Sequence, residues 1–164
     1  MKKTLLLLTF SLIFLSALRS QPHQNAQMQF VGAWTLRSCT ATGKDGKATF
    51  PYGQHPSGQI QYDPSGNMMV LIVNPEIPKF KSEVSEEGST EEISAAYKNM
   101  FSYYGTYTVV PDSHLVVHHV AACSFPNWTG IDQKRFYEFR GDQLILRAVL
   151  AGNMRYELIW QRKH

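Results

Sequence analysis

The sequence predicts an all-β protein: an eight-stranded up-and-down antiparallel barrel with one short helix in the connection between the third and fourth strands. Three observations lead to this prediction. Eight short runs are rich in β-branched and aromatic residues, turn residues separate them, and long connections alternate with short ones. Closing such a sheet on itself leaves no strand edge unpaired.

The first part of the predicted barrel contains three strands and the helix. Residues 21–29 are polar, and the first run covers residues 30–41. The second and third runs, residues 58–62 and 68–73, flank Asp63-Pro64-Ser65-Gly66-Asn67, a composition typical of a tight turn. Ser89-Thr90-Glu91-Glu92 has the pattern of a helix cap, and apolar residues at helical spacing extend this helix to about Met100.

The remaining five strands follow with short turns between most of them. Their runs cover residues 103–110, 114–122, 132–139, 143–149 and 154–161. If successive strands alternate in direction, the short turns at 63–67, 111–113 and 140–142 lie at one end. The long connections at 42–57, 74–102 and 123–131 then lie at the other. We therefore expect a cup with a closed base and an open mouth, of a size that can hold one small ligand.

The first 20 residues have the features of a secretory signal peptide. Lys2-Lys3 precede an apolar stretch from residue 5 to 15, and the small residues that follow place the cut between Ala17 and Ser20. An exported, periplasmic or secreted protein is therefore expected. No later stretch approaches the length of about 20 apolar residues that spans a bilayer, so no transmembrane segment is expected in the mature chain.

Composition excludes several other classes of protein. The chain has 164 residues, which suits one barrel domain over residues 30–162. Three of its 16 basic residues lie in the leader, so the remainder only balances the 13 acidic residues. A nucleic-acid partner would need a concentrated basic face, so none is expected. The sequence does not indicate an oligomeric state.

Two cysteines, Cys39 and Cys123, leave two interpretations open. Export would permit a disulfide between them. The topology places both near one rim but on strands far apart around the barrel, whereas a bridge needs Cα atoms within about 7 Å. The alternative is two partly buried thiols that act as small apolar residues.

Several motifs together resemble the lipocalin-like domain family of bacteria and fungi, which has the calycin type of barrel. Gly32-Ala33-Trp34 opens the first strand and Trp160-Gln161-Arg162 closes the last. The other matching motifs are Pro51-Tyr52-Gly53 to Tyr62, Tyr104-Gly105-x-Tyr107, His118-His119-Val120, and Pro126-Asn127-Trp128 to Arg135. The resemblance covers residues 30–162 and implies that Arg162 stacks on Trp34 at the closed base. It implies a fold but no uniform reaction or ligand.

Strand alternation sorts the side chains into those that face the lumen and those that face water. In the run 132–139, Lys134 and Glu138 share the outer face, which points Arg135, Tyr137 and Phe139 inward. The same reasoning points four more side chains inward: Ile60, Tyr62, Tyr103 and Tyr107. The lumen should thus hold several phenols, apolar surface and one guanidinium.

Arg135 is the inward residue with the strongest requirement for a partner, because an unpaired buried charge is costly and a guanidinium does not lose its proton. One interpretation is a protein network of tyrosines and an acid. The other is a carboxylate or phosphate of a ligand. Few inward acids are evident, since Glu157 shares an outer face with Arg155.

His118 and His119 are adjacent on a strand, so only one of them can face the lumen. This argues against a metal site made from the pair, no acidic residue stands at a zinc-ligand spacing, and no metal or cofactor is expected. The inward histidine is either bonded to a tyrosine within the barrel or acts as a general base, a haem ligand or a ligand contact. The candidate catalytic residues are His118, His119 and Tyr107.

Aromatic and amide groups on the mouth loops suit a small amphipathic ligand, although Trp128 could instead plug the barrel as packing. The residues expected to contact a ligand are Tyr52, His55, Tyr62, Tyr103, Tyr107, His118, Asn127, Trp128, Arg135 and Tyr137.

Three functions are compatible with these features. The first is an exported protein that binds a small apolar or aromatic ligand in the lumen. This ligand could also carry an anionic group that Arg135 binds. The second is a barrel isomerase or cyclase that moves a proton with the inward histidine and a tyrosine, although no recognised hydrolase or nucleotide-binding motif is present. The third is a structural or interaction protein with a filled barrel, which a cavity below about 300 Å³ would favour.

Overall fold

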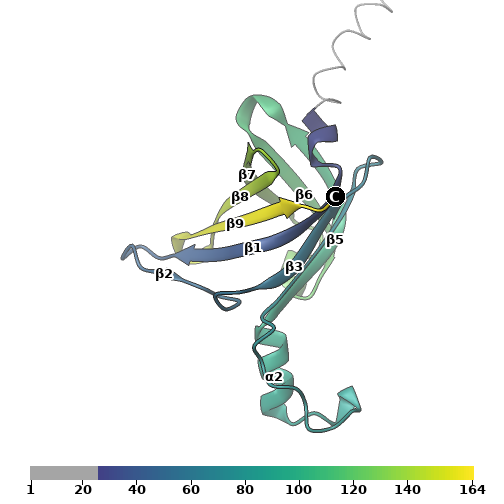
Figure 1. Cartoon of the computed structure of the whole chain (residues 1–164), viewed down its shortest axis with the longest axis vertical. Coiled ribbons are helices and arrows are strands. Elements are labelled where there is room, and N and C mark those ends of the chain that lie inside the picture. The colour runs from purple at the N-terminus through teal and green to yellow at the C-terminus, as the bar shows by residue number, and fades with distance from the viewer. Residues whose placement is uncertain (1–25) are drawn as a thin grey trace, which may run out of the picture.

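The strands form a single antiparallel sheet that closes into a barrel (Figure 1). The computed structural model describes residues 26–164, so the leader predicted over residues 1–20 lies outside the described residues. The strands are β1 (Gly32–Thr42), β2 (Ala48–Thr49), β3 (Ser57–Tyr62), β4 (Asn67–Val73), β5 (Met100–Val110), β6 (Leu115–Cys123), β7 (Asp132–Arg140), β8 (Gln143–Leu150) and β9 (Met154–Arg162). The helix α2 (Thr90–Lys98) lies between β4 and β5.

Pairing between the first and last long strands closes the barrel. β1 pairs with β3 on one side and with β9 on the other, and each remaining long strand pairs with its neighbours in sequence. The predicted eight-stranded up-and-down barrel with one short helix is thus confirmed. The sequence did not predict the two-residue strand β2, which lies within the connection 42–57. It pairs antiparallel with the end of β1, where Ala41 is opposite Thr49.

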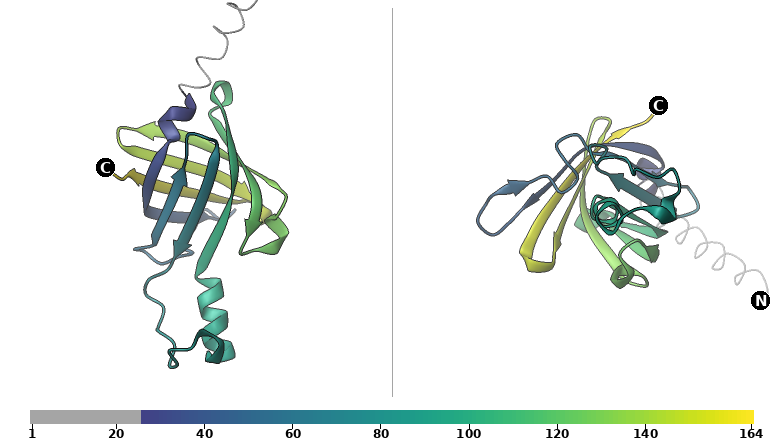
Figure 2. Two further views of the ribbon diagram at one scale, coloured as in Figure 1. Left: turned by 90° about the vertical axis from the view of Figure 1, so that its right-hand side faces the viewer. Right: turned by 90° about the horizontal axis from the view of Figure 1, so that it is seen from below.

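The two ends of the barrel differ as the connection lengths predicted. The C-terminus lies at the end with the short turns, and α2 projects from the opposite end (Figures 1 and 2). Ser89 caps α2 by a capping box in which it exchanges hydrogen bonds with Glu92. No residue of α2 is buried, so the helix adds little to the core.

A cluster of aromatic side chains fills the base. Residues 26–30 are helical, which corrects the prediction that Phe30 begins the first strand. The helical turn carries the Phe30 ring into the barrel end, where it meets Tyr62, Tyr137 and Phe139 at centroid distances of 4.9–5.3 Å. The guanidinium of Arg162 lies 4.0 Å from the centroid of the Trp34 ring, so this pair closes the base.

A β-bulge in β1 changes which side chains face the lumen. Register shifts between Leu36 and Ser38, so Cys39 and Ala41 are buried in place of the residues that strict alternation from Trp34 would select. Cys39 and Cys123 are both free thiols, which favours the second of the two interpretations above. Their strands, β1 and β6, are separated by three others in the sheet order.

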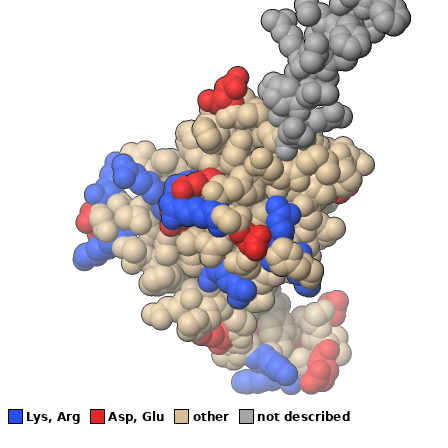
Figure 3. Space-filling model, turned by 45° about the horizontal axis from the view of Figure 1, so that its top comes forward, with Lys and Arg blue, Asp and Glu red and all other residues tan. Residues whose placement is uncertain are grey.

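The described surface mixes charges of both signs, with basic and acidic side chains interspersed on the face in view (Figure 3). On the outer wall, Arg147 bonds to Glu138 at 2.9 Å and to Glu157 at 2.7 Å. Within residues 26–164, no helix is long and apolar enough to cross a bilayer.

Candidate functional site

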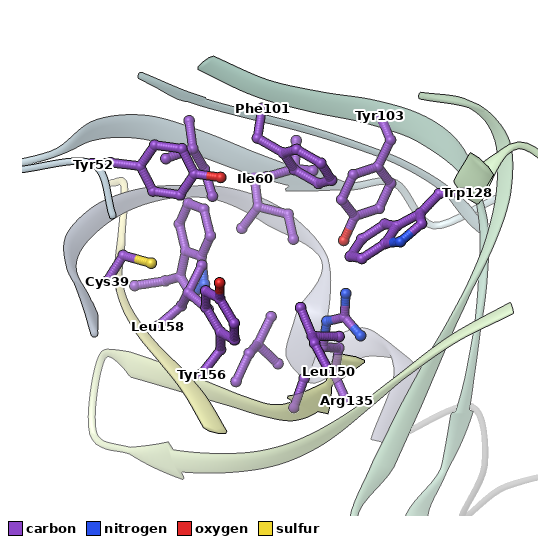
Figure 4. Close-up of a pocket in the computed structure, with 15 residues that line it drawn as sticks. Cys39, Tyr52, Ile60, Phe101, Tyr103, Trp128, Arg135, Leu150, Tyr156 and Leu158 are labelled. Carbon is purple, nitrogen blue, oxygen red and sulfur yellow. The ribbon is translucent and has the colours of Figure 1, made fainter. Parts of the chain in front are cut away.

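A cavity of about 160 Å³ occupies the half of the barrel nearer the long connections. The aromatic cluster around Phe30 fills the other half. Strands β3, β4, β8 and β9 supply most of the cavity wall through inward aliphatic side chains, among them Ile60, Val70, Ile72, Leu146, Ala148 and Leu158. The cavity is partly open, and Figure 4 shows its labelled side chains converging on one space.

The polar side chains labelled in Figure 4 lie in two groups around the cavity. Tyr52, Tyr156 and Cys39 are on one side, and Tyr103, Trp128 and Arg135 are on the other. Burial raises the pKa of the Cys39 thiol to about 12 and raises that of the Tyr52 phenol, so both are protonated at neutral pH. No acidic or amide side chain is among the lining residues of the described chain.

Arg135 is a buried cation without a carboxylate partner in the described part of the protein. Its side chain is 7% exposed, and Nη1 donates to the Lys134 carbonyl at 2.9 Å and to Gln133 Oε1 at 3.4 Å. Its guanidinium carbon lies 5.4 Å from the centroid of the Trp128 ring. Strand alternation sends Glu138 of β7 and Glu157 of β9 outward, where both bind Arg147 instead.

His118 is the inward member of the histidine pair and is fully buried behind Tyr103. Its Nε2 is 2.8 Å from the Tyr62 hydroxyl, and its Nδ1 is 2.8 Å from the Tyr103 hydroxyl. Burial, reinforced by the charge of Arg135, holds the pKa of His118 well below its usual range, so the ring is neutral and carries one proton. Burial likewise raises the pKa of both phenols, which keep their protons.

The protonation states of His118 and of the two phenols determine which group donates in each of the hydrogen bonds from His118 to Tyr62 and to Tyr103. Tyr62 is 1% exposed, and its hydroxyl has no other hydrogen-bond partner among the described residues. Its O–H therefore donates to Nε2, because otherwise it would be a buried donor without an acceptor. The N–H at Nδ1 of His118 then donates to the Tyr103 oxygen. The O–H of Tyr103 is therefore free to donate to another acceptor. Since Tyr103 lines the cavity, its hydroxyl is a donor beside Arg135.

The buried neutral state of His118 predicts a pH dependence of stability. A histidine whose pKa is lowered by folding stabilises the protein fully above the unfolded pKa of about 6.5, and that stability is lost as the pH falls. We expect the free energy of unfolding to decrease below pH 6.5 by up to about 1.4 kcal/mol per pH unit from this group. In His118→Gln, which keeps a donor and an acceptor but does not titrate, this slope should be absent.

Urea denaturation between pH 5 and 8 measures the effect. The matched control is His119→Gln on the outer wall, where His119 Nδ1 is 2.7 Å from Asp132 and Nε2 is 3.0 Å from the Thr108 hydroxyl. H119Q should retain the slope that His118 produces. An identical slope in the wild type and H118Q would contradict the assignment.

The structure brings together four of the ten residues expected to contact a ligand: Tyr52, Tyr103, Trp128 and Arg135. Tyr62 and His118 face inward but lie behind Tyr103. Tyr107 and Tyr137 face inward at the base, where both rings lie near Phe30 and do not line the cavity, and the Tyr107 hydroxyl donates to the Asp63 carbonyl at 2.9 Å. Alternation indicates which face of a strand a side chain is on, but not how far along the barrel axis it lies. These four residues were therefore assigned to the ligand site although they do not line the cavity.

The mouth loops differ from expectation in the same way. His55 and Asn127 are exposed and do not line the cavity, because each loop turns only one aromatic side chain inward, Tyr52 or Trp128. Within residues 26–164, no three His, Cys, Asp or Glu side chains form a cluster suited to a metal ion.

Sequence reasoning missed four cavity residues that carry chemistry or aromatic surface: Cys39, Phe101, Tyr156 and Trp160. Alternation along β9 would have found Tyr156, because it shares the inner face with Leu158 and Trp160. Phe101 was missed because β5 begins at Met100, earlier than predicted. The β1 bulge concealed Cys39.

The fold places this protein in the class of closed up-and-down β-barrels with a cavity in the lumen. Aromatic side chains fill one end of the barrel, and the cavity occupies the other. The chain belongs to the lipocalin-like domain family, whose sequence model matches residues 31–163. The resemblance expected from the sequence is thereby confirmed.

Solved structures with a similar fold include designed barrels and a fluorescent protein. A redesigned β-barrel bound to DFHBI is 15% identical, with 84% of this chain and 98% of that chain covered and a TM-score of 0.41. A mutant of the fluorescent protein UnaG is 14% identical, with 82% and 96% covered and a TM-score of 0.39. No curated protein sequence matches the chain.

Proposed function

We propose that this protein binds a small, largely apolar or aromatic ligand in the barrel cavity and that Arg135 binds an anionic group of that ligand. The observation that carries the proposal is a buried guanidinium that borders the cavity and has no carboxylate partner in residues 26–164. A carboxylate can accept from the guanidinium and from the Tyr103 hydroxyl together, and charge-assisted bonds of this kind are strong in a buried site.

The cavity volume limits the size of the ligand. At about 160 Å³ the cavity is smaller than the range of roughly 300–1,000 Å³ typical of drug-sized ligands. By volume alone it favours a filled barrel, and only the unpaired guanidinium and the donor groups favour a ligand. A dry apolar cavity of about 150 Å³ can bind benzene. The proposal is therefore confined to ligands with about one ring or an equally short chain inside the barrel.

Direct proton transfer by His118 has less support. His118 does not line the cavity, because both of its ring nitrogens are bonded to tyrosines and Tyr103 stands between the ring and the open space. A ligand in the cavity would meet the neutral phenol of Tyr103 and not the imidazole.

Calorimetric titration with benzoate and benzamide tests the proposal. The two compounds have nearly the same shape and differ in charge, so the acid should bind about 10- to 100-fold more tightly through charge-assisted bonds to Arg135. A wider panel of small aromatic and aliphatic acids, each paired with its amide, covers other shapes. If no acid in the panel binds more tightly than its amide, the proposal is wrong.

Export remains part of the proposal and rests on the leader sequence alone. Protein isolated from its own host should lack the leader, with a first residue just after a cut between Ala17 and Ser20. Intact mass measurement checks this point, and native mass spectrometry of the same sample detects any bound small molecule.

A further inference from the structure

Two phenol groups line the cavity on the side opposite Arg135. Figure 4 shows the hydroxyl oxygens of Tyr52 and Tyr156 directed into the space that both side chains border. Neither hydroxyl has a hydrogen-bond partner in residues 26–164, and neither is among the buried polar atoms that lack one. Both hydroxyls are therefore open to the cavity, where they can bond to water or to a ligand.

The strand register places Tyr156 two strands away from Arg135, with a small residue between them. Tyr156 pairs with Ala148 of β8. Between β7 and β8, Phe136 pairs with Arg147, and Arg135 and Ala148 are the next residues along the two strands. Adjacent strands are about 4.8 Å apart. Because Ala148 has only a methyl group, the space between the two long side chains stays open as part of the cavity.

A β-turn holds Tyr52 beside the same space. The Gly53 N–H donates to the Phe50 carbonyl at 3.1 Å, which closes the turn over residues 50–53. Pro51 has the fixed φ that suits the second position of such a turn, and Gly53 has a φ of +78°, which a residue with a side chain rarely adopts. The backbone on both sides of Tyr52 is therefore restricted, and this sets the direction of its ring.

This side of the cavity is polar but uncharged. Burial raises the pKa of both the Tyr52 and the Tyr156 phenol, with a smaller contribution from the neighbouring Cys39 thiol, so both keep their protons at neutral pH. A protonated phenol both donates and accepts hydrogen bonds. Arg135, the one cation among the lining residues of the described chain, lies on the opposite side. A neutral group that both donates and accepts suits the two phenols better than a second anion.

We propose that Tyr52 and Tyr156 together bind a neutral hydroxyl group on the same small ligand whose anionic group Arg135 binds. The inference rests on the proposed function and narrows the ligand class to acids that carry a hydroxyl group on the far side of a ring or of an equally short chain. One phenol donates to the ligand hydroxyl, and the other accepts from it. The cavity of about 160 Å³ has room for one ring between the two polar sides.

Acids that differ in one hydroxyl group test this inference by calorimetry. The compounds 3- and 4-hydroxybenzoate are compared with 3- and 4-methylbenzoate, which have nearly the same shape. In the wild-type chain at least one hydroxy acid should bind more tightly than its methyl counterpart, because the cavity offers two hydrogen-bonding groups to the hydroxyl. If the methyl acid binds more tightly at both positions, the hydroxyl is buried without partners and the inference is wrong.

Phenylalanine variants identify the residues that bind the hydroxyl. In Tyr52→Phe and in Tyr156→Phe, the ratio of hydroxy to methyl affinity should fall about tenfold relative to the wild type, as expected for one lost hydrogen bond. A general change in the cavity affects both acids and cancels in this ratio. The matched control is Tyr104→Phe, which removes a hydroxyl from an outer-wall ring that is 58% exposed and should leave the ratio unchanged.

Tyrosine ¹³Cζ resonances provide a readout in the wild-type chain. The resonances of Tyr52 and Tyr156 should differ between the complexes with the hydroxy acid and with its methyl counterpart, because the carbon that carries a phenol oxygen responds to hydrogen bonding. The Tyr104 resonance is the internal control and should be the same in both complexes. This measurement decides the question even if a variant does not fold.

The outcomes separate this inference from the proposed function. If either variant keeps the wild-type ratio, or if neither resonance distinguishes the two acids, the assignment of the hydroxyl to the tyrosine pair is wrong. The proposed function then still stands if benzoates bind more tightly than benzamides. If no acid binds more tightly than its amide, the proposed function fails and the role of Tyr52 and Tyr156 fails with it.

Discussion

Arg135→Met should weaken binding of benzoate by about 10- to 100-fold and should make the empty protein more stable by about 1–3 kcal/mol. The affinity falls because the variant removes the charged donor that borders the cavity. The stability rises because methionine has a similar length and no charge to desolvate. Opposite signs for affinity and stability are the signature of a group retained for a ligand.

Calorimetry with benzoate and urea denaturation of the empty protein measure the two quantities. The matched control is Arg147→Met on the outer wall, which breaks the ion pairs of Arg147 with Glu138 and Glu157. R147M should leave benzoate binding unchanged and should not stabilise the protein. If R135M destabilises the empty protein as strongly as a core truncation, Arg135 is a structural residue and the anion proposal loses its main support.

The barrel could be predicted from the sequence because the patterns that indicate it are local and recur in every strand and turn. Each strand has its own alternation, each tight turn has its own Gly, Asp or Asn, and the capping box at Ser89 was complete. Closure was predicted because eight antiparallel strands joined in sequence leave no edge unpaired when the sheet closes into a barrel. The strand β2 has two residues, too few for a periodic signal.

The candidate site was less predictable from the sequence. It depends on how far along the barrel axis each side chain lies, on which side chains the loops turn inward, and on the register between strands. The helical turn at residues 26–30 inserts Phe30 into the base and divides the lumen into a filled half and a hollow half. Nothing in strand alternation shows that division, so Tyr107 and Tyr137 were assigned to a site that they do not reach. One bulged residue in β1 likewise decides that Cys39 faces the cavity.

The sequence nevertheless identified the group that matters most in the proposal. Arg135 was selected because alternation pointed it inward and placed Glu157 on the outer face. The structure adds the fact that Glu157 is engaged by Arg147 at 2.7 Å. No sequence motif indicates that the buried indole N–H of Trp160 lacks an acceptor, because hydrogen-bond satisfaction is a property of the packed core.

Trp34→Ala should destabilise the protein by about 3–5 kcal/mol, the largest loss of stability expected for a single substitution here. Trp34 is fully buried, donates to the Phe30 carbonyl at 2.7 Å and lies under the guanidinium of Arg162. Alanine would leave a cavity and remove the hydrogen bond that holds the helical turn on the barrel. Urea denaturation measures the loss.

Two further variants show whether the effect arises from the base plug. Trp34→Phe keeps an aromatic ring but removes the indole donor, so it should cost about 1–3 kcal/mol and remain folded at neutral pH. Tyr104→Ala removes an outer-wall ring that is 58% exposed and should change stability by less than about 0.5 kcal/mol. Because Trp34 does not line the cavity, a W34F protein that folds should still bind benzoate through Arg135. Loss of binding in that variant would mean that the base plug and the cavity are not independent, and the division of the lumen into a structural half and a binding half would be wrong.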